Sequence, residues 1–265
     1  MTYAQKTAGF LAHRKYGITA FETIDSTNLE AKRQISTGVN DAHVIIADSQ
    51  TDGRGRMGRS FFSPAGSGIY ISYIKELPEN TENLPLLTSF AGIAVCNAIE
   101  SMLPDSAPQC KIKWPNDIYI KARKICGILT SLVTDTKSNR ISHAIVGIGI
   151  NVTSARNDFP EELWLKAGSI LSQTNIKLEP EEVCAKLITE LDKLFFEEQI
   201  LNKKQPNLIE TLRTRSMTIG HDVEFNCDGQ RLMGRATDIN TDGSLLVTGN
   251  FGQKNVSSGE SVVLI

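Results

Sequence analysis

The chain has 265 residues, 40% of them apolar, which is enough for one large domain or for a large domain with a small one. Its formal net charge of −2 argues against a protein that coats nucleic acid non-specifically, because such proteins are normally basic. No run of residues has the length and apolar character of a signal peptide or membrane span, and the five cysteines are scattered and never spaced as CxxC. We therefore expect a cytoplasmic protein with reduced thiols, no membrane partner and no metal held by a cysteine or histidine cluster.

The first part of the chain alternates short strands and helices. Thr27 and Glu30 have capping-box spacing, which predicts a helix that starts within 26–30, and a buried helix is expected at 86–103. Apolar runs and alternating patterns predict strands at 44–47, 69–74, 111–114, 118–120, 125–133 and 143–152, with a basic turn at 121–124. Gly147 and Gly149 lie inside the last of these strands, which indicates that another group approaches the backbone closely there.

The pattern changes in the last part of the chain. An amphipathic helix is expected from Pro180 to Ile200, with proline and two glutamates at its start. After about residue 219 the sequence predicts short strands separated by tight turns, two of which are marked by Asp228-Gly229 and Asp242-Gly243. The strands are expected at 223–225, 234–239, 245–247 and 262–265. We predict an α+β domain at 1–217 followed by a small β-barrel at 218–265.

Residues 53–59 read Gly-Arg-Gly-Arg-Met-Gly-Arg and form the most informative segment of the chain. Arg54, Arg56 and Arg59 each offer a forked set of donors suited to phosphate or carboxylate, and the glycines let backbone N–H groups approach an anion. The three like charges repel one another, so the loop is expected to be mobile until an anion binds. An RGG-like RNA-binding tract is the alternative, although such tracts usually repeat and carry interleaved aromatic residues.

A second polar segment, Lys113-Trp-Pro-Asn-Asp117, follows a predicted strand. Pro115 forces a bend, so Asn116 and Asp117 are presented where the strand breaks. Asn116 could contact a purine edge or another polar ligand, and Asp117 could orient a lysine or help to hold a metal. Lys113, Lys124 and Asn151 add polar groups nearby. Solvated lysines and ordinary turn chemistry remain the alternative interpretation of this segment.

The chain shows no Ser/His/Asp arrangement, no paired glutamates and no P-loop. Its arginines and lysines therefore suit stabilisation of developing charge better than nucleophilic attack. Phosphoryl or nucleotidyl transfer fits that role, because positioning and electrostatics supply most of the rate in such reactions.

Six motifs in one order make the prediction specific. Together they resemble the biotin protein ligases, also called biotin–[acetyl-CoA-carboxylase] ligases, and the resemblance runs from about residue 20 into the C-terminal barrel. The motifs are Asp25-Ser-Thr-Asn28, Gln50-Thr-Asp-Gly-Arg-Gly-Arg-Met-Gly-Arg59, Phe62-Ser-Pro64, Lys113-Trp-Pro-Asn-Asp117, Lys124-Ile-Cys-Gly-Ile128 and Gly147-Ile-Gly-Ile-Asn151.

The resemblance implies a catalytic domain related to class II aminoacyl-tRNA synthetases, with a mixed sheet and helices, followed by an SH3-like barrel. It also implies a reaction in two steps with biotin, ATP and Mg²⁺. The carboxylate of biotin attacks the α-phosphate of ATP to give biotinyl-5′-AMP and pyrophosphate. A lysine of a biotin acceptor domain, the biotin carboxyl carrier protein of a carboxylase, then attacks the mixed anhydride and releases AMP.

The resemblance also implies roles for individual residues. Those expected to act in catalysis are Arg54, Lys113 and Lys124. Those expected to bind biotin are Ser26, Thr27, Asn28, Gln50, Gly53, Arg54, Gly55, Arg56, Lys124 and Gly127. Those expected to bind ATP are Arg54, Arg56, Arg59, Phe61, Asn116, Asp117, Lys124 and Asn151. Phe61 falls where the family often has tryptophan, and residues 153–162 fall where a second ligand-ordered loop is expected.

Some relatives carry an N-terminal winged helix and repress biotin synthesis. Only about two dozen residues precede Asp25, so we expect no DNA-binding module. A homodimer formed through a sheet edge is common in the family and is possible here. The alternatives are a lipoate or octanoate transferase on the same scaffold, a nucleic-acid-binding module, and an inactive binding scaffold.

Overall fold

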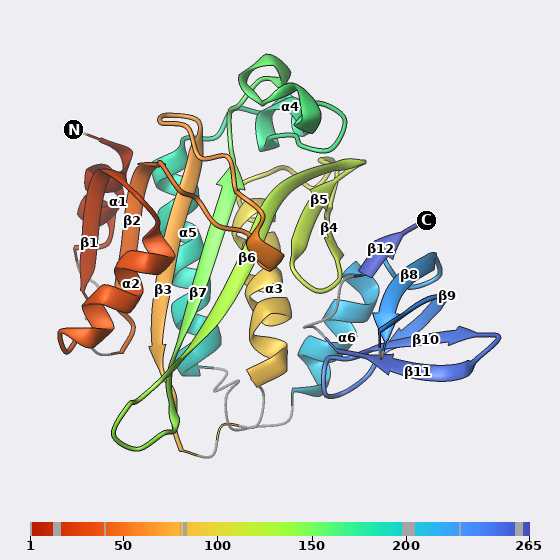
Figure 1. Ribbon diagram of the computed structural model, residues 1–265. Coiled ribbons are helices and arrows are strands. Elements are labelled where there is room, and N and C mark those ends of the chain that lie inside the picture. The colour runs from red at the N-terminus through yellow and green to blue at the C-terminus, as the bar shows by residue number, and fades with distance from the viewer. Residues whose placement is uncertain are drawn as a thin grey trace.

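The computed structural model describes residues 2–12, 17–39, 41–79, 81, 84–197, 205–227, 229–257 and 262–265. Its centre is a seven-stranded mixed sheet with the strand order β1-β2-β3-β7-β6-β5-β4 (Figure 1). β1 and β2 pair in parallel and the other neighbours pair antiparallel. The strands are β1 (Ile18–Ile24), β2 (Val44–Gln50), β3 (Gly68–Glu76), β4 (Cys110–Lys113), β5 (Asp117–Ile120), β6 (Arg123–Thr134) and β7 (Ile141–Asn151).

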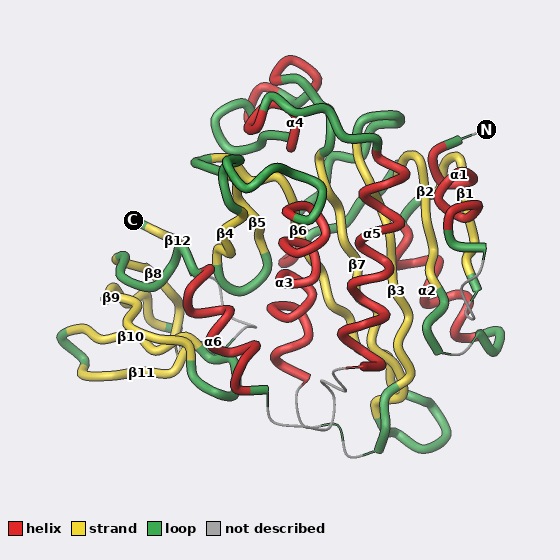
Figure 2. The backbone as a smooth tube through the Cα atoms, turned by 180° about the vertical axis from the view of Figure 1, so that it is seen from behind, coloured by secondary structure: helices red, strands yellow, loops and turns green. Residues whose placement is uncertain are grey.

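Helices cover the two faces of this sheet unequally. α3 (Leu87–Glu100) and α5 (Pro180–Asp192) run along the rear face, as Figure 2 shows from behind. On the front face α2 (Thr27–Ser36) packs Ala31 against Ile45, Ile74 and Ile145. The remaining helices are α1 (Tyr3–Phe10), α4 (Ile170–Thr174) and α6 (Pro206–Arg215), with 3-10 turns at Arg56–Gly58, Leu84–Leu86, Arg156–Asp158 and Glu161–Leu163. Part of the front face is therefore left for loops to cover.

The C-terminal residues form a separate antiparallel sheet of five strands, in the order β11-β10-β9-β8-β12. This arrangement is consistent with the expected SH3-like domain. The strands are β8 (Asp222–Cys227), β9 (Gln230–Ile239), β10 (Leu245–Gly249), β11 (Gly252–Val256) and β12 (Val262–Leu264). Gly243 has a positive φ of 84°, as the predicted turn at 242–243 requires, whereas Asp228 of the other predicted turn lies outside the described residues. The boundary at 217/218 stays a prediction.

Several predicted boundaries were wrong. Ser26, not Thr27, is the N-cap of α2, and it makes no side-chain cap hydrogen bond. The helix predicted at 86–103 ends at Glu100, and the one predicted to reach Ile200 ends at Asp192, followed by a π-helical turn at Lys193–Glu197 and then by residues outside the described ranges. β11 was not predicted, because its first four residues, Gly-Gln-Lys-Asn, include no apolar side chain that would show the alternation of a strand.

None of the helices in the described part of the chain is long and apolar enough to cross a membrane. Within the same residues none of the five cysteines forms a disulfide.

Candidate active site

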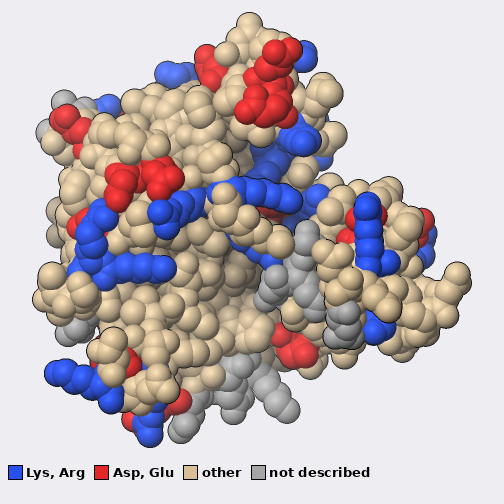
Figure 3. All heavy atoms as spheres, in the orientation of Figure 1, with Lys and Arg blue, Asp and Glu red and all other residues tan. Residues whose placement is uncertain are grey.

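A cavity of about 670 Å³ opens on the front face of the main sheet. Its floor is formed by β3, β5, β6 and β7, and its cover is formed by the loops at 54–62 and 159–167. Lys and Arg side chains form a band across this face of the molecule (Figure 3). Among the described residues six Lys or Arg residues line the cavity but only one acidic residue, Asp117. The cavity is therefore suited to an anion.

Two rows of cross-strand neighbours make the floor. In the first row Gly147 of β7 lies between Ser72 of β3 and Leu129 of β6. The Asn28 side chain lies over this glycine, donates from Nδ2 to the Leu129 carbonyl at 3.3 Å and accepts a hydrogen bond from Ser72. A Cβ at position 147 would lie 2.2 Å from Asn28 Oδ1, so only glycine leaves room for this amide.

In the second row Gly149 of β7 lies between Tyr70 and Gly127. The Phe61 ring covers both glycines, since a Cβ at 149 would lie 2.4 Å from the ring and one at 127 would lie 3.2 Å from it. Phe61 also contacts Tyr70 edge to face, with ring centroids 6.4 Å apart. The prediction that a group approaches the backbone at Gly147 and Gly149 is confirmed, and the groups are Asn28 and Phe61.

One end of the cavity is polar and mainly uncharged. Thr27 donates from its backbone N–H and from Oγ1 to Gln50 Oε1, at 2.9 and 3.2 Å. Gln50 Nε2 in turn donates to Ser63 Oγ at 2.9 Å, and Ser72 Oγ lies 2.9 Å from Thr27 Oγ1. These bonds orient a set of hydroxyl and amide groups around Asn28, so this end can recognise a neutral polar group.

Another part of the lining holds four cationic side chains that act on one another or on Asp117, called here the cation cluster: Arg56, Arg59, Lys113 and Lys124. Lys124 Nζ pairs with Asp117 Oδ1 at 2.7 Å. Asn116 links the glycine–arginine loop to this pair, because it accepts from Arg56 Nη1 at 3.0 Å and donates to Asp117 Oδ1 at 2.9 Å.

Burial and mutual repulsion make this cluster unfavourable without a bound anion. Burial lowers the pKa of Lys113 below its usual value, and the charges of Lys124 and Arg59 lower it further against the opposing effect of Asp117. Burial is also the main cause of the lowered pKa of Arg56, and Arg59 adds to it. A ligand with several negative charges would relieve both effects.

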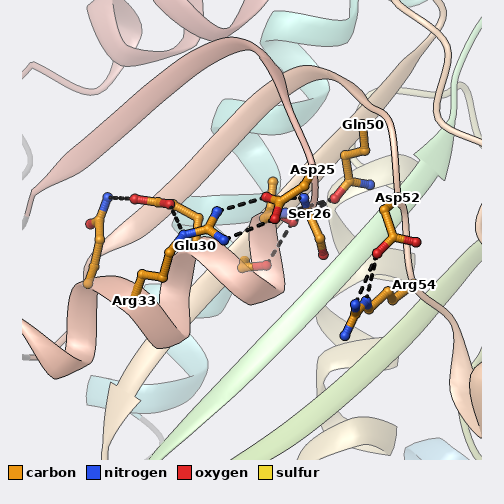
Figure 4. Close-up of polar contacts among 10 residues, drawn as sticks. Asp25, Ser26, Glu30, Arg33, Gln50, Asp52 and Arg54 are labelled. Carbon is orange, nitrogen blue, oxygen red and sulfur yellow. Dashed lines mark hydrogen bonds and ion pairs between the residues drawn. The ribbon is translucent and has the colours of Figure 1, made fainter.

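The glycine–arginine loop is folded as a small hairpin. Arg54 and Ser60 form a β-bridge, and Phe61 N donates to the Gly53 carbonyl at 2.7 Å. Met57 and Gly58 both have positive φ at the tip. The Arg54 guanidinium pairs with Asp52 at 3.0 Å near the base of the loop (Figure 4). Arg56 thus reaches out of the loop to Asn116, next to β5, whereas Arg54 pairs with Asp52 in its own segment.

The second loop is tied to the same site through its backbone. Lys124 N donates to the Lys166 carbonyl and Gly168 N donates to the Lys124 carbonyl, both at 2.9 Å. The buried Asn151 amide donates to the Gly168 carbonyl at 2.9 Å. Phe159 of this loop contacts Phe62 of the glycine–arginine loop, with ring centroids 6.2 Å apart. The two loops therefore meet over the cavity.

Almost all of the predicted site residues line this one cavity. The exception is Gly53, which lies at the base of the hairpin, where a Cβ would come within 2.4 Å of the Phe61 carbonyl oxygen. Residues that line the cavity without having been assigned to the site are mainly aromatic or apolar, together with Lys166; they include Phe62, Tyr119, Phe159, Leu163, Ala167, Val262 and Val263. Ser72, buried beneath Thr27 and Asn28, was also missed. A serine within an apolar strand was the only signal for it.

Comparison with known proteins places this chain in a family. Residues 20–151 match the Biotin/lipoate A/B protein ligase family. The bifunctional ligase/repressor BirA of Bacillus subtilis is 30% identical over 239 residues, which cover 90% of this chain and 71% of that protein. The biotin–[acetyl-CoA-carboxylase] ligase of Mycobacterium tuberculosis is 29% identical over 242 residues, covering 90% and 86%. The biotin protein ligase of Aquifex aeolicus, solved with biotin and ATP, superposes with a TM-score of 0.77 at 27% identity, covering 94% and 99%. The chain therefore belongs to the biotin/lipoate A/B protein ligase family.

Proposed function

We propose that this protein is a biotin protein ligase, which activates biotin with ATP and transfers it to a lysine of an acceptor protein. The observation that carries the proposal is the continuity of the cavity, in which a neutral polar end leads directly to the cation cluster. Biotin has a neutral ureido ring at one end and a carboxylate at the other, so it matches this order of groups. The named relatives, one of them solved with biotin and ATP, support the same reaction.

In the proposed arrangement the ureido ring lies against Ser26, Thr27, Asn28 and Gln50, and the biotin carboxylate points toward Lys124. The first step requires two anions, this carboxylate and the α-phosphate, to meet although they repel each other. The cation cluster offsets that repulsion, and each charge-assisted hydrogen bond contributes roughly 1.5–3 kcal/mol. A carboxylate oxygen then bonds to the α-phosphorus, and the bond from that phosphorus to the bridging oxygen of pyrophosphate breaks.

In the second step the amine of the acceptor lysine attacks the acyl carbon of the adenylate. The new C–N bond forms as the C–O bond to AMP breaks, and the amine loses its proton. The two loops, joined through Phe62 and Phe159, would keep water from the anhydride until the acceptor arrives. Phe61, Asn116 and Asn151 are proposed to contact the nucleotide, with Arg54 and Arg59 at the phosphates.

We further propose that Mg²⁺ binds as the complex with ATP, coordinated by the triphosphate. Asp117, the one acidic residue that lines the cavity in the described ranges, is paired with Lys124, and those ranges contain no cluster of three potential metal-ligating side chains. This donor set fits an ion whose ligands are mostly phosphate oxygens and water, with Asp117 as the protein carboxylate nearby. The ion would supply additional positive charge at the phosphates.

The acceptor is proposed to be the biotin carboxyl carrier domain of a carboxylase. A cytoplasmic location fits the five cysteines, none of which forms a disulfide within the described residues. β1 lies at an edge of the main sheet and could pair with a second copy, so we also propose a homodimer, which sedimentation would test.

The deciding experiment is incubation of the protein with ATP, biotin and a biotin acceptor domain. We expect the acceptor to gain the mass of one biotinyl group and pyrophosphate exchange to depend on biotin. Lipoate, which the family name covers, and octanoate are supplied in parallel as alternative substrates. Exchange with either of them and not with biotin would refute the proposal.

A further inference from the structure

Arg33 of α2 lies beside Asp25, the residue that precedes the Ser26–Asn28 part of the cavity lining (Figure 4). Arg33 donates from Nη1 and Nη2 to the two carboxylate oxygens of Asp25, at 2.9 and 2.7 Å. Its Nε donates to Glu30 Oε2 at 2.7 Å, and the other oxygen of Glu30 accepts from Gln34 Nε2 at 3.0 Å. The bidentate geometry fixes direction as well as distance, so the guanidinium holds the Asp25 carboxylate in one orientation.

Asp25 also accepts hydrogen bonds from two segments that lead into the site. Its Oδ1 accepts from the backbone N–H of Ser26 at 2.7 Å, and its carbonyl accepts from the backbone N–H of Asp52 at 2.8 Å. Ser26 is the N-cap of α2 and is followed by Thr27 and Asn28, whereas Asp52 begins the glycine–arginine loop. The Ser26 side chain makes no cap hydrogen bond, so the acceptors that hold this turn are the Asp25 carboxylate at Ser26 N and Gln50 Oε1 at Thr27 N.

We propose that Arg33 and Asp25 are positioning residues for the biotin end of the cavity, an inference that rests on the proposed function. Neither residue lines the cavity, so each would act through the turn at 25–28. The hydrogen bonds from Arg33 and from Ser26 N hold the pKa of Asp25 at about 2, so the carboxylate stays charged at neutral pH. The Arg33 and Asp25 side chains are 51% and 38% exposed, so solvent screening limits what their pairing adds to global stability. Their effect should therefore appear in substrate binding.

The test compares Arg33→Ala with Arg140→Ala, which breaks another exposed pair, with Glu79, away from the cavity. In biotin-dependent pyrophosphate exchange, Arg33→Ala should raise the KM for biotin roughly three- to tenfold, with little change in the KM for ATP or in Tm. Arg33→Lys should restore only part of the loss, because an ammonium does not present the planar fork of a guanidinium. Asp25→Asn should raise the same KM, and the double variant Asp25→Asn/Arg33→Ala should be no worse than either change alone.

Two results would overturn the inference while the wild-type protein remains active with biotin. One is a KM for biotin in Arg33→Ala equal to that of Arg140→Ala. The other is an equal rise in the KM for biotin and for ATP together with a lower Tm, which would mean that Arg33 only supports the fold. If the wild-type protein shows no biotin-dependent exchange, the proposed function itself fails, and the inference fails with it.

Discussion

Replacing Gly147 with alanine tests the geometry of the cavity floor most directly. The added Cβ would lie 2.2 Å from Asn28 Oδ1 and 2.7 Å from both Cγ and Nδ2 of the same side chain. Such distances are far below van der Waals contact, so the amide must move. The surrounding strands hold position 147 on both sides, whereas Asn28 is a side chain that can rotate. We therefore expect Asn28 to leave its place.

The size of the effect follows from what Asn28 would lose. The residue is 7% exposed, and its side chain makes hydrogen bonds with the Leu129 carbonyl and with Ser72. Two hydrogen bonds of roughly 0.5–1.5 kcal/mol each give a loss of about 1–3 kcal/mol in the free energy of unfolding. For a chain of this size each kcal/mol lowers Tm by about 2–4 °C. Affinity for biotin should fall as well, because Asn28 lies in the polar end of the cavity.

A double-mutant cycle in urea, with biotin titrations of each variant, measures both quantities. In an Asn28→Ala background the new methyl group meets no amide, so Gly147→Ala should cost at most about 0.5 kcal/mol there. Gly9→Ala is the matched control, since a Cβ at this helical glycine meets no atom within 4 Å and should be neutral or stabilising. If Gly147→Ala were as stable as this control, or if its cost were the same with and without Asn28, the assigned contact would be wrong.

Three further predictions concern the cation cluster. Arg56→Gly should fold normally but release biotinyl-AMP roughly 10- to 100-fold faster, because it loses the charge-assisted bond to Asn116; an unchanged adenylate off-rate, measured by filter retention, would contradict this. Lys124→Ala should abolish biotin-dependent pyrophosphate release with Tm nearly unchanged, and near-normal release would remove Lys124 from the mechanism. Because the pKa of Lys113 is lowered, kcat/KM for ATP should fall at alkaline pH with an apparent pKa below 10.5, as the amine loses its charge. Lys113→Arg should shift this alkaline fall in kcat/KM to higher pH. If the fall stayed at the same pH, it would reflect the titration of another group.

The sequence alone predicted the main features of the fold and most of the polar and charged residues that line the cavity. The spacing of apolar residues predicted the principal helices and strands, because burial of one face makes apolar residues recur at a regular interval along the chain. Glycine inside a strand is also informative, because a missing side chain there indicates that another group lies close to the backbone. Gly147 and Gly149 both have such a neighbour. The capping-box interpretation of Thr27 failed because Ser26 is the N-cap and the Thr27 hydroxyl bonds to Gln50, at the end of β2.

Other features depend on contacts that local sequence does not encode. Lys166 and Ala167 reach the site because the Lys166 carbonyl and the Gly168 N–H form backbone hydrogen bonds with Lys124, which almost any residue type can supply. Strand register and the position of α2 on the sheet decide which residue covers Gly147. They also place Ser72 beneath Asn28. Both features depend on long-range packing of the whole domain. The residue types needed for the site can therefore be predicted from the sequence, whereas their arrangement within the cavity depends on the tertiary structure.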